Sequence, residues 1–257
     1  MARWVRFEHK GQPGFGTLRE DVIRVFQGDM FGSPIRTDDY LRLSEVGVRT
    51  PCNASKMVCI WNNFHELSTK LGMQPPDEPL YLLKAPSAFL AHGQTIRRPA
   101  FYTGKVAYEG ELGIVIGTRC SCVEEAEAHD YILGYTCVND VTAADIINRN
   151  PDFAQWTRAK SFDTFGVFGP VIETNVDPMT LRVRTVLNGQ ERQNYPVSDM
   201  IFPPSKLVSL LSEDMTLLPG DVIACGTSFG VGTMKNPTNT VEVSIEGIGT
   251  LSNVFAQ

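Results

Sequence analysis

Between residues 106 and 117 the chain reads Val106-Ala107-Tyr108-Glu109-Gly110-Glu111-Leu112-Gly113-Ile114-Val115-Ile116-Gly117. This apolar run carries two carboxylates, Glu109 and Glu111, which would share one face of a strand because side chains at i and i+2 point the same way. The opposite face would carry Leu112, Ile114 and Ile116. Two like charges on a half-buried strand repel each other and lose hydration, so they need a cation, a shared proton or basic partners. A bound divalent metal ion is the leading interpretation.

The composition predicts a globular protein with one large core. The chain has 257 residues, of which 42% are hydrophobic, enough for one large domain or one domain with a small appendage. The net charge of -6 and the lack of basic clusters interleaved with aromatic residues argue against a nucleic-acid partner. No run of about 18 apolar residues occurs, and the first residues lack the apolar core of a signal peptide. We therefore expect a cytoplasmic protein without a membrane role.

The cysteines fit this expectation. The six cysteines form no CxxC pair, and we expect them to be reduced core thiols. Cys120 and Cys122 could offer soft ligands, but without a second pair they do not make a structural zinc site.

Patterning divides the chain into a small β-rich segment, residues 1–50, and a main body, residues 51–257. We expect strands at residues 5–7, 14–18, 22–26, 56–61, 81–84, 181–187 and 240–245. Asn188-Gly189 predicts a tight hairpin after the sixth of these strands. We expect short helices at residues 62–72, 123–131 and 204–211. The predicted fold class is mostly β with a few short helices (α+β).

Asp140 is a candidate third acid of the metal site. It ends the apolar run Gly134-Tyr135-Thr136-Cys137-Val138-Asn139-Asp140. Mg²⁺ and Mn²⁺ prefer oxygen ligands and usually keep several waters, so three carboxylates would leave positions open for a substrate. The alternative is that Asp140 or Asp145 only caps a helix running through Ile147.

Two further segments carry candidate binding groups. Lys160 lies between Trp156 and a Phe-rich segment, where a cation could bind a substrate carboxylate or stabilise an enolate oxygen. A solvated or ion-paired lysine is the alternative. The loop Gly226-Thr227-Ser228-Phe229-Gly230-Val231-Gly232 lets backbone N–H groups approach an anion. Its spacing fits neither a phosphate loop nor a dinucleotide loop, so a tight turn remains possible.

Together these segments resemble the fumarylacetoacetate hydrolase family, from about Val58 to the C-terminus. The resemblance implies a mixed β-sandwich roll, usually dimeric, preceded here by the small β-rich segment. It implies Mg²⁺, Mn²⁺ or Ca²⁺ held by Glu109, Glu111 and Asp140. It also implies Lys160 as the partner of a substrate oxygen, and Thr227 with Gly226 as contacts of a substrate carboxylate. The expected partners are a small 2-oxo or 1,3-diketo acid and a second copy of the chain.

The chain departs from the family pattern at two places. Many members carry Asn-Tyr-x-x-His-x-x-Glu, whose His-Glu pair activates water, whereas Leu67 and Lys70 stand at those positions here. His65 and Glu66 are the nearest replacements, although adjacent helical residues do not face each other. The family often also has an Ala-Arg-Asp segment after the third acid. This chain has Ala143-Ala144-Asp145 instead, and Arg149 is a candidate substitute.

These departures favour one class of chemistry. Decarboxylation and keto–enol isomerisation need an electron sink and a proton donor, whereas C–C hydrolysis also needs an activated water. We therefore predict a metal-dependent decarboxylase or isomerase that acts on a 2-oxo dicarboxylic acid through an enolate, as in aromatic catabolism. The alternatives are a C–C hydrolase of a diketo acid and a non-catalytic metal-binding relative. A structural β protein whose glutamates pair with Arg97, Arg98 or Lys105 is a weaker alternative.

Overall fold

β11 (Gly110–Ile116) lies inside the largest sheet of the protein. The computed structural model describes residues 2–257. β11 pairs with β12 (Ile132–Asp140) on one side and with β17 (Val222–Ala224) on the other. Leu112 and Ile114 face one apolar cluster and Val115 faces a second one. The predicted alternation is therefore correct, but the strand is buried on both faces rather than half-buried, because apolar side chains cover each side of the sheet.

The strands form three sheets. The largest has twelve strands, ten of them in the order β4-β3-β2-β1-β14-β12-β11-β17-β6-β7. Its members other than β11, β12 and β17 are β1 (Arg3–His9), β2 (Gln12–Arg19), β3 (Val22–Gly28), β4 (Pro34–Arg42), β5 (Gly47–Val48), β6 (Met57–Trp61), β7 (Leu80–Lys84), β8 (Phe89–Leu90) and β14 (Gly166–Glu173). The three-stranded sheet contains β10 (Val106–Tyr108), β13 (Thr142–Ala143) and β18 (Gly232–Thr233). The five-stranded sheet contains β9 (Thr95–Arg97), β15 (Arg182–Leu187), β16 (Gln190–Pro196), β19 (Thr238–Ile245) and β20 (Gly249–Ala256).

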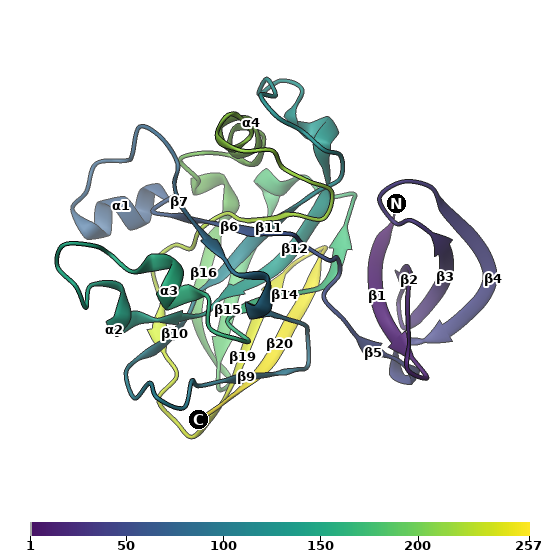
Figure 1. Cartoon of the computed structure of the whole chain (residues 1–257), viewed down its shortest axis with the longest axis horizontal. Helices are drawn as coiled ribbons and strands as arrows, with labels where there is room; N and C mark the ends of the chain where they lie inside the picture. Colours follow the sequence, from purple (N-terminus) through teal and green to yellow (C-terminus); the bar gives the residue numbers. More distant parts are fainter. Residues whose placement is uncertain (1) are drawn as a thin grey trace.

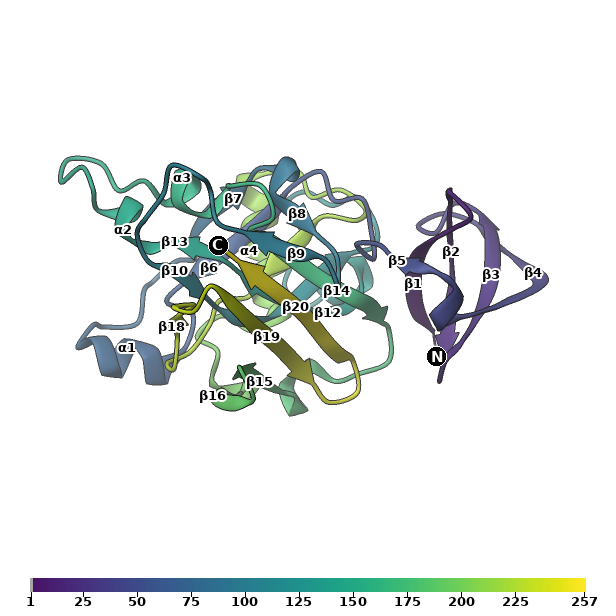
Figure 2. The same ribbon diagram turned by 90° about the horizontal axis from the view of Figure 1, so that it is seen from below.

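The first five strands form a unit of their own beside the rest of the protein, as two perpendicular views show (Figures 1 and 2). Backbone pairing of β1 with β14 joins this unit to the large sheet. Three of its strands contain the expected runs, and β4 is an additional one. Most residues of β4 are exposed, so its sequence lacks the alternation of apolar residues by which strands are predicted.

Hairpins organise the five-stranded sheet. Asn188 and Gly189 have φ of 51° and 76° between β15 and β16, as a tight two-residue turn requires. β19 alternates buried and more exposed residues and returns through a short turn into β20. The Asn188-Gly189 hairpin and the strand at residues 240–245 were expected from the sequence. The mostly-β fold class with a few short helices is therefore confirmed.

Four short α-helices accompany the sheets: α1 (His65–Leu71), α2 (Ala144–Ile147), α3 (Trp156–Lys160) and α4 (Pro204–Asp214). α1 ends at Gly72, which has φ of 66° and closes the helix as a C-cap. No side chain caps α2, so neither Asp140 nor Asp145 has the capping role that was the alternative. Within residues 2–257 no helix is long and apolar enough to cross a membrane.

Three details of the sequence prediction are wrong. Residues 123–131 form turns and a single 3-10 turn, Ala128–Tyr131, rather than an α-helix. Only Val123 and Ala128 are buried there, and their spacing of five places no stripe on one helix face. Cys122 is exposed, whereas the other five cysteines are buried. The expected strand 106–117 is interrupted at Glu109, which lies between β10 and β11 in two different sheets.

Candidate metal centre and active site

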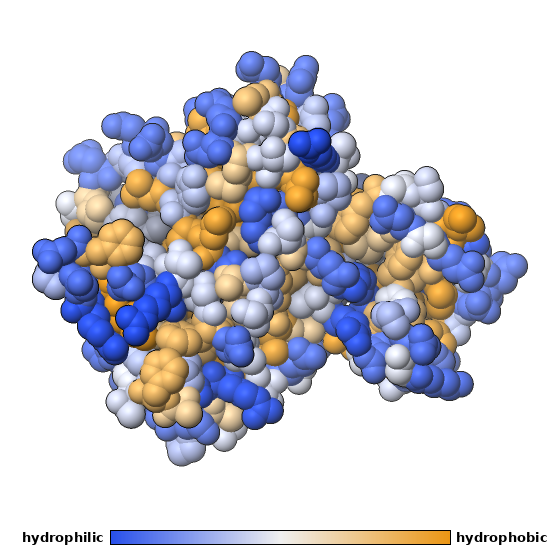
Figure 3. Space-filling view, viewed as in Figure 1, coloured by the Kyte–Doolittle hydropathy of each residue, from blue (hydrophilic) through white to orange (hydrophobic). Residues whose placement is uncertain are grey.

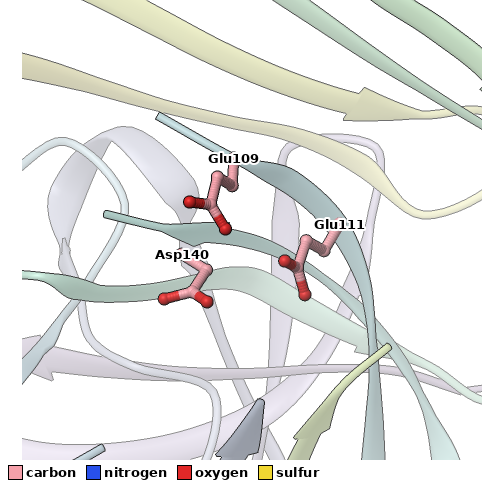
Figure 4. Close-up of side chains that lie close together, drawn as sticks. All are labelled: Glu109, Glu111 and Asp140. Carbon is pink, nitrogen blue, oxygen red and sulfur yellow. The ribbon is translucent and has the colours of Figure 1, made fainter. Parts of the chain in front are cut away.

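The carboxylates of Glu109, Glu111 and Asp140 gather at one point. One oxygen from each lies within 4.8 Å of the others, and the close-up shows the three side chains projecting from adjacent backbone segments (Figure 4). Strand register produces this arrangement, because Gly110 on β11 pairs with Asn139 on β12. The next residue along β12 is Asp140, whose N–H donates to the carbonyl of Glu109 over 2.8 Å.

Two buried lysines face this group of acids. Lys160 Nζ lies 2.8 Å from Glu109 Oε2 and 2.6 Å from Asp140 Oδ2. Lys84 Nζ lies 2.6 Å from Asp140 Oδ1 and also donates to the carbonyls of Val141, Lys160 and Phe165. Lys84 thus ties Asp140 to the backbone around α3. It was not among the predicted site residues, because its partners come from segments far away in the sequence.

The charges explain why a cation fits here. Two ammonium groups balance two of the three carboxylates, so the third is unbalanced whenever it ionises in this buried site. Glu111 is the acid without a lysine contact among the described residues. Burial, together with the charges of Asp140 and Glu109, raises its pKa well above the ordinary value. Burial also opposes the ionisation of Asp140, but Lys160 and Lys84 hold its pKa below the usual range.

The remaining contacts leave the acids open to an ion. Glu109 Oε1 accepts from Thr142 Oγ1 over 2.9 Å, and Glu111 Oε2 accepts from the N–H of Gly226 over 2.9 Å. The other oxygen of Glu111 has no hydrogen-bond donor among residues 2–257. Three clustered carboxylates with one unbalanced charge are the donor set that Mg²⁺ or Mn²⁺ prefers. The residues present therefore fit a divalent cation.

The loop after β17 closes over the acids from another direction. Gly226 has φ of 90°, and a Cβ there would lie 2.9 Å from the carbonyl oxygen of Ile60. This left-handed conformation turns its N–H toward Glu111. Thr227 Oγ1 donates to the carbonyl of Gly110 over 2.9 Å and accepts from Gln193 Nε2 over 2.8 Å. The Thr227 hydroxyl therefore already uses its proton to hold the loop against β11.

A cavity of about 510 Å³ opens beside the acids. Its polar lining includes Glu109, Asp140, Lys160 and Thr227. Its apolar walls come from several elements and include Trp61, Leu67, Leu71, Leu82, Ile147, Trp156, Phe229 and Val231. Apolar surface is also visible on the face of the molecule that carries α1–α3, among more hydrophilic residues (Figure 3). The cavity thus has charged side chains at the metal centre and mostly apolar side chains in the rest of its lining.

Three predicted residues lie elsewhere. His65 and Glu66 are exposed on α1, and Arg149 is exposed after α2; none of them lines the cavity. Helical periodicity explains the first two, because Leu67, Lys70 and Leu71 occupy the face of α1 that lines the cavity. Their proposed roles as catalytic and substrate-binding groups stay predictions. The structure brings together Glu109, Glu111, Asp140, Lys160, Gly226 and Thr227.

The comparisons with known proteins agree with this geometry. The sequence profile "Fumarylacetoacetate (FAA) hydrolase C-terminal" matches residues 56–256. The chain belongs to the fumarylacetoacetate hydrolase family. A second profile, "Rv2993c-like, N-terminal", matches residues 2–51. The family resemblance expected from the sequence is thereby confirmed.

Three relatives of the family show the range of names among similar chains. Protein Rv2993c of Mycobacterium tuberculosis is 42% identical over 95% of this chain and 89% of its own length. Oxaloacetate tautomerase YisK of Bacillus subtilis is 36% identical over 82% of this chain and 73% of its own length. The crystal structure of 2-hydroxyhepta-2,4-diene-1,7-dioate isomerase from Mycobacterium marinum has a TM-score of 0.90 and 38% identity, and the match covers 100% of this chain and 98% of that one. Family members are thus enzymes that act on oxo acids, including isomerases and tautomerases.

Proposed function

We propose that this protein is a divalent-metal-dependent enzyme that acts on a 2-oxo carboxylic acid through its enolate, in keto–enol isomerisation or in decarboxylation. The observation that carries this proposal is the lining of the cavity. Within residues 2–257, the cavity has no histidine in its lining, and its only carboxylates are Glu109 and Asp140. Both of these acids accept hydrogen bonds from Lys160, so neither is free to activate a water molecule.

Isomerisation and decarboxylation do not need an activated water molecule. Isomerisation moves a proton between C3 and the oxygen on C2, and decarboxylation releases CO₂ from a β-carboxylate and leaves an enolate that takes up a proton at C3. A divalent cation held by Glu109, Glu111 and Asp140 would supply a Lewis acid that lowers the energy of the enolate. Names of similar proteins support this class of reaction, since one is an oxaloacetate tautomerase and another a dienedioate isomerase.

Lys160 is the side chain that donates a hydrogen bond to a substrate oxygen. An ammonium group has three N–H donors, and two of those on Lys160 go to Glu109 and Asp140. The third donor is available to an oxygen of the bound acid, because Lys160 lines the cavity. Burial opposes its charge, but Asp140 and Glu109 raise the pKa of Lys160 above the usual value. Lys160 therefore acts as a fixed cation and hydrogen-bond donor rather than as a base.

The test follows three reactions of the purified protein with Mn²⁺: keto–enol change, decarboxylation and C–C cleavage. Oxaloacetate is monitored for ultraviolet keto–enol change and for CO₂ release, and acetylpyruvate is monitored for C–C cleavage. We expect keto–enol change or CO₂ release that stops when EDTA is added. Cleavage of acetylpyruvate faster than both oxaloacetate reactions would instead favour a C–C hydrolase. Absence of turnover of any 2-oxo acid would favour a non-catalytic relative.

A further inference from the structure

Two of the cavity groups outside the metal centre carry N–H donors with no hydrogen-bond acceptor or ionic partner within residues 2–257. The Nδ2 atom of Asn62 is buried and makes no hydrogen bond among the described residues, although Asn62 lines the cavity. Lys70 also lines the cavity and belongs to none of the ion pairs within residues 2–257. A buried donor without an acceptor costs about 1–3 kcal/mol. An acceptor carried by a ligand would remove this cost.

The backbone fixes the orientation of Asn62. Its φ is 56°, a left-handed conformation that Asn adopts more readily than most residues. Its Oδ1 accepts from Ser68 Oγ on α1 over 3.0 Å. Since the amide oxygen is bound to α1, the amide nitrogen is the atom left for the cavity. The same contact ties Asn62 to the helix that carries Lys70.

Lys70 is held at the rim of the same cavity. Its Nζ lies 4.9 Å from the centroid of the Phe229 ring, a cation–π contact between α1 and the loop after β17. Lys70 is on the cavity-facing side of α1 together with Leu67 and Leu71. The other cavity-lining residues of α1, Leu67 and Leu71, are apolar. A cation and an amide donor in an apolar wall make a site for an anion.

We infer that Asn62 and Lys70 bind a second carboxylate of the substrate, at the end opposite its 2-oxo acid group. This inference rests on the proposed function and deepens it, because it assigns two residues to the second carboxylate of a 2-oxo dicarboxylic acid, the substrate class expected from the sequence. Lys160 and a cation held by Glu109, Glu111 and Asp140 would contact one end of the substrate, and Asn62 and Lys70 contact the other. The pair selects for the second carboxylate and takes no part in proton transfer.

The experiment compares oxaloacetate with phenylpyruvate, which has no second carboxylate. Both have keto–enol equilibria that ultraviolet absorption follows, and both are measured with Mn²⁺. For Lys70→Met we expect KM for oxaloacetate to rise about tenfold, as for loss of a hydrogen bond to a charged group, with kcat within about twofold. Turnover of phenylpyruvate should change by less than about twofold. Lys235→Met is the matched control, because Lys235 is exposed and does not line the cavity.

A second variant tests the amide. Asn62→Asp keeps the oxygen that accepts from Ser68 and a residue type that tolerates the left-handed backbone, but it places a carboxylate where the donor was. We expect a larger rise in KM for oxaloacetate than Lys70→Met causes. The control is Asn188→Asp, which makes the same change at another left-handed asparagine, with φ of 51° in the β15–β16 turn.

The possible outcomes separate the two proposals. An unchanged KM for oxaloacetate in Lys70→Met, or equal losses with both substrates, overturns the assignment of Asn62 and Lys70 while the proposed function stands. If the wild type turns over neither substrate, the proposed function fails. The carboxylate site is then measured by calorimetric titration with malate, whose binding should weaken about tenfold in Lys70→Met. Equal affinity for malate in the wild type and in this variant would reject the site.

Discussion

Lys84 and Asp140 form a fully buried ion pair, with 2.6 Å between Nζ and Oδ1. Lys84 comes from the end of β7 and Asp140 from the end of β12, so the pair fixes the position of a candidate metal ligand across the large sheet. Lys84 also donates to three backbone carbonyls. Its role is therefore to position Asp140 rather than to contact the substrate.

Lys84→Met should destabilise the protein by about 4 kcal/mol, because it removes one of the two cations that face three buried carboxylates and leaves three backbone carbonyls without that donor. Urea unfolding without metal measures this loss. Lys206→Met is the control, since Lys206 pairs with Glu125 at 3.9 Å with side chains 44% and 55% exposed, and we expect a change below about 1 kcal/mol. Similar losses in the two variants would contradict the assigned role of Lys84.

Glu111→Gln should remove the response of the protein to metal. In the wild type, Mn²⁺ at about 100 times its Kd should add about 2.7 kcal/mol of stability, or roughly 5 °C or more in Tm for a chain of this size. The variant has the same shape but loses the acid that no lysine balances. Differential scanning fluorimetry with and without EDTA provides the measurement. The control is Glu246→Gln, which changes an exposed glutamate in the β19–β20 turn and should respond to Mn²⁺ as the wild type does. A full Tm shift on adding Mn²⁺ to Glu111→Gln would exclude Glu111 as a ligand.

Gly226→Ala should lower both stability and metal affinity. At φ of 90° the new Cβ would lie 2.9 Å from the carbonyl oxygen of Ile60, and relief of this contact moves the N–H that binds Glu111. We expect a loss of about 2 kcal/mol in urea unfolding. Gly72→Ala separates the backbone strain of a positive φ from the steric clash of a new Cβ. Gly72 has φ of 66°, but nothing lies within 4 Å of its Cβ position. This control should cost about 1 kcal/mol and leave Mn²⁺ binding unchanged. A weakened Mn²⁺ affinity in Gly72→Ala would argue against the local explanation.

Cys52 should make stability fall at alkaline pH. Burial raises the pKa of its thiol to about 12, so the folded protein keeps the thiol neutral while the unfolded chain ionises it near pH 9. The stabilisation is complete below about pH 9 and is lost as the pH rises toward 12. Between pH 8 and pH 10 the wild type should lose about 1 kcal/mol more than Cys52→Ser, which keeps a hydroxyl donor for the carbonyl of Gly220. Parallel stability curves for the two proteins would show that Cys52 does not titrate in this way.

Local signals predicted most of the secondary structure. The Asn188-Gly189 turn, the alternation in β19 and the Gly72 end of α1 each depend on a few neighbouring residues, and such preferences act within one element. The exposed strand β4 and the turns at residues 123–131 were not predicted correctly. Their conformation depends on pairing and packing with other segments rather than on their own apolar pattern.

The candidate site also has one part that the sequence predicts and another that only the tertiary structure shows. The sequence by itself marked Glu109 and Glu111 as a pair of acids that needs a cation or basic partners, because acids are rarely buried in an apolar strand. It left Asp140 open between a metal ligand and a helix cap, and the family resemblance favoured the ligand. Only the tertiary structure decided which cations face these acids, that Lys84 holds Asp140, and that Lys70 rather than His65 lines the cavity. The physical reason is that ion pairs and cavity walls form between side chains from distant segments. Their energy depends on distance and burial in three dimensions, which the order of residues does not contain.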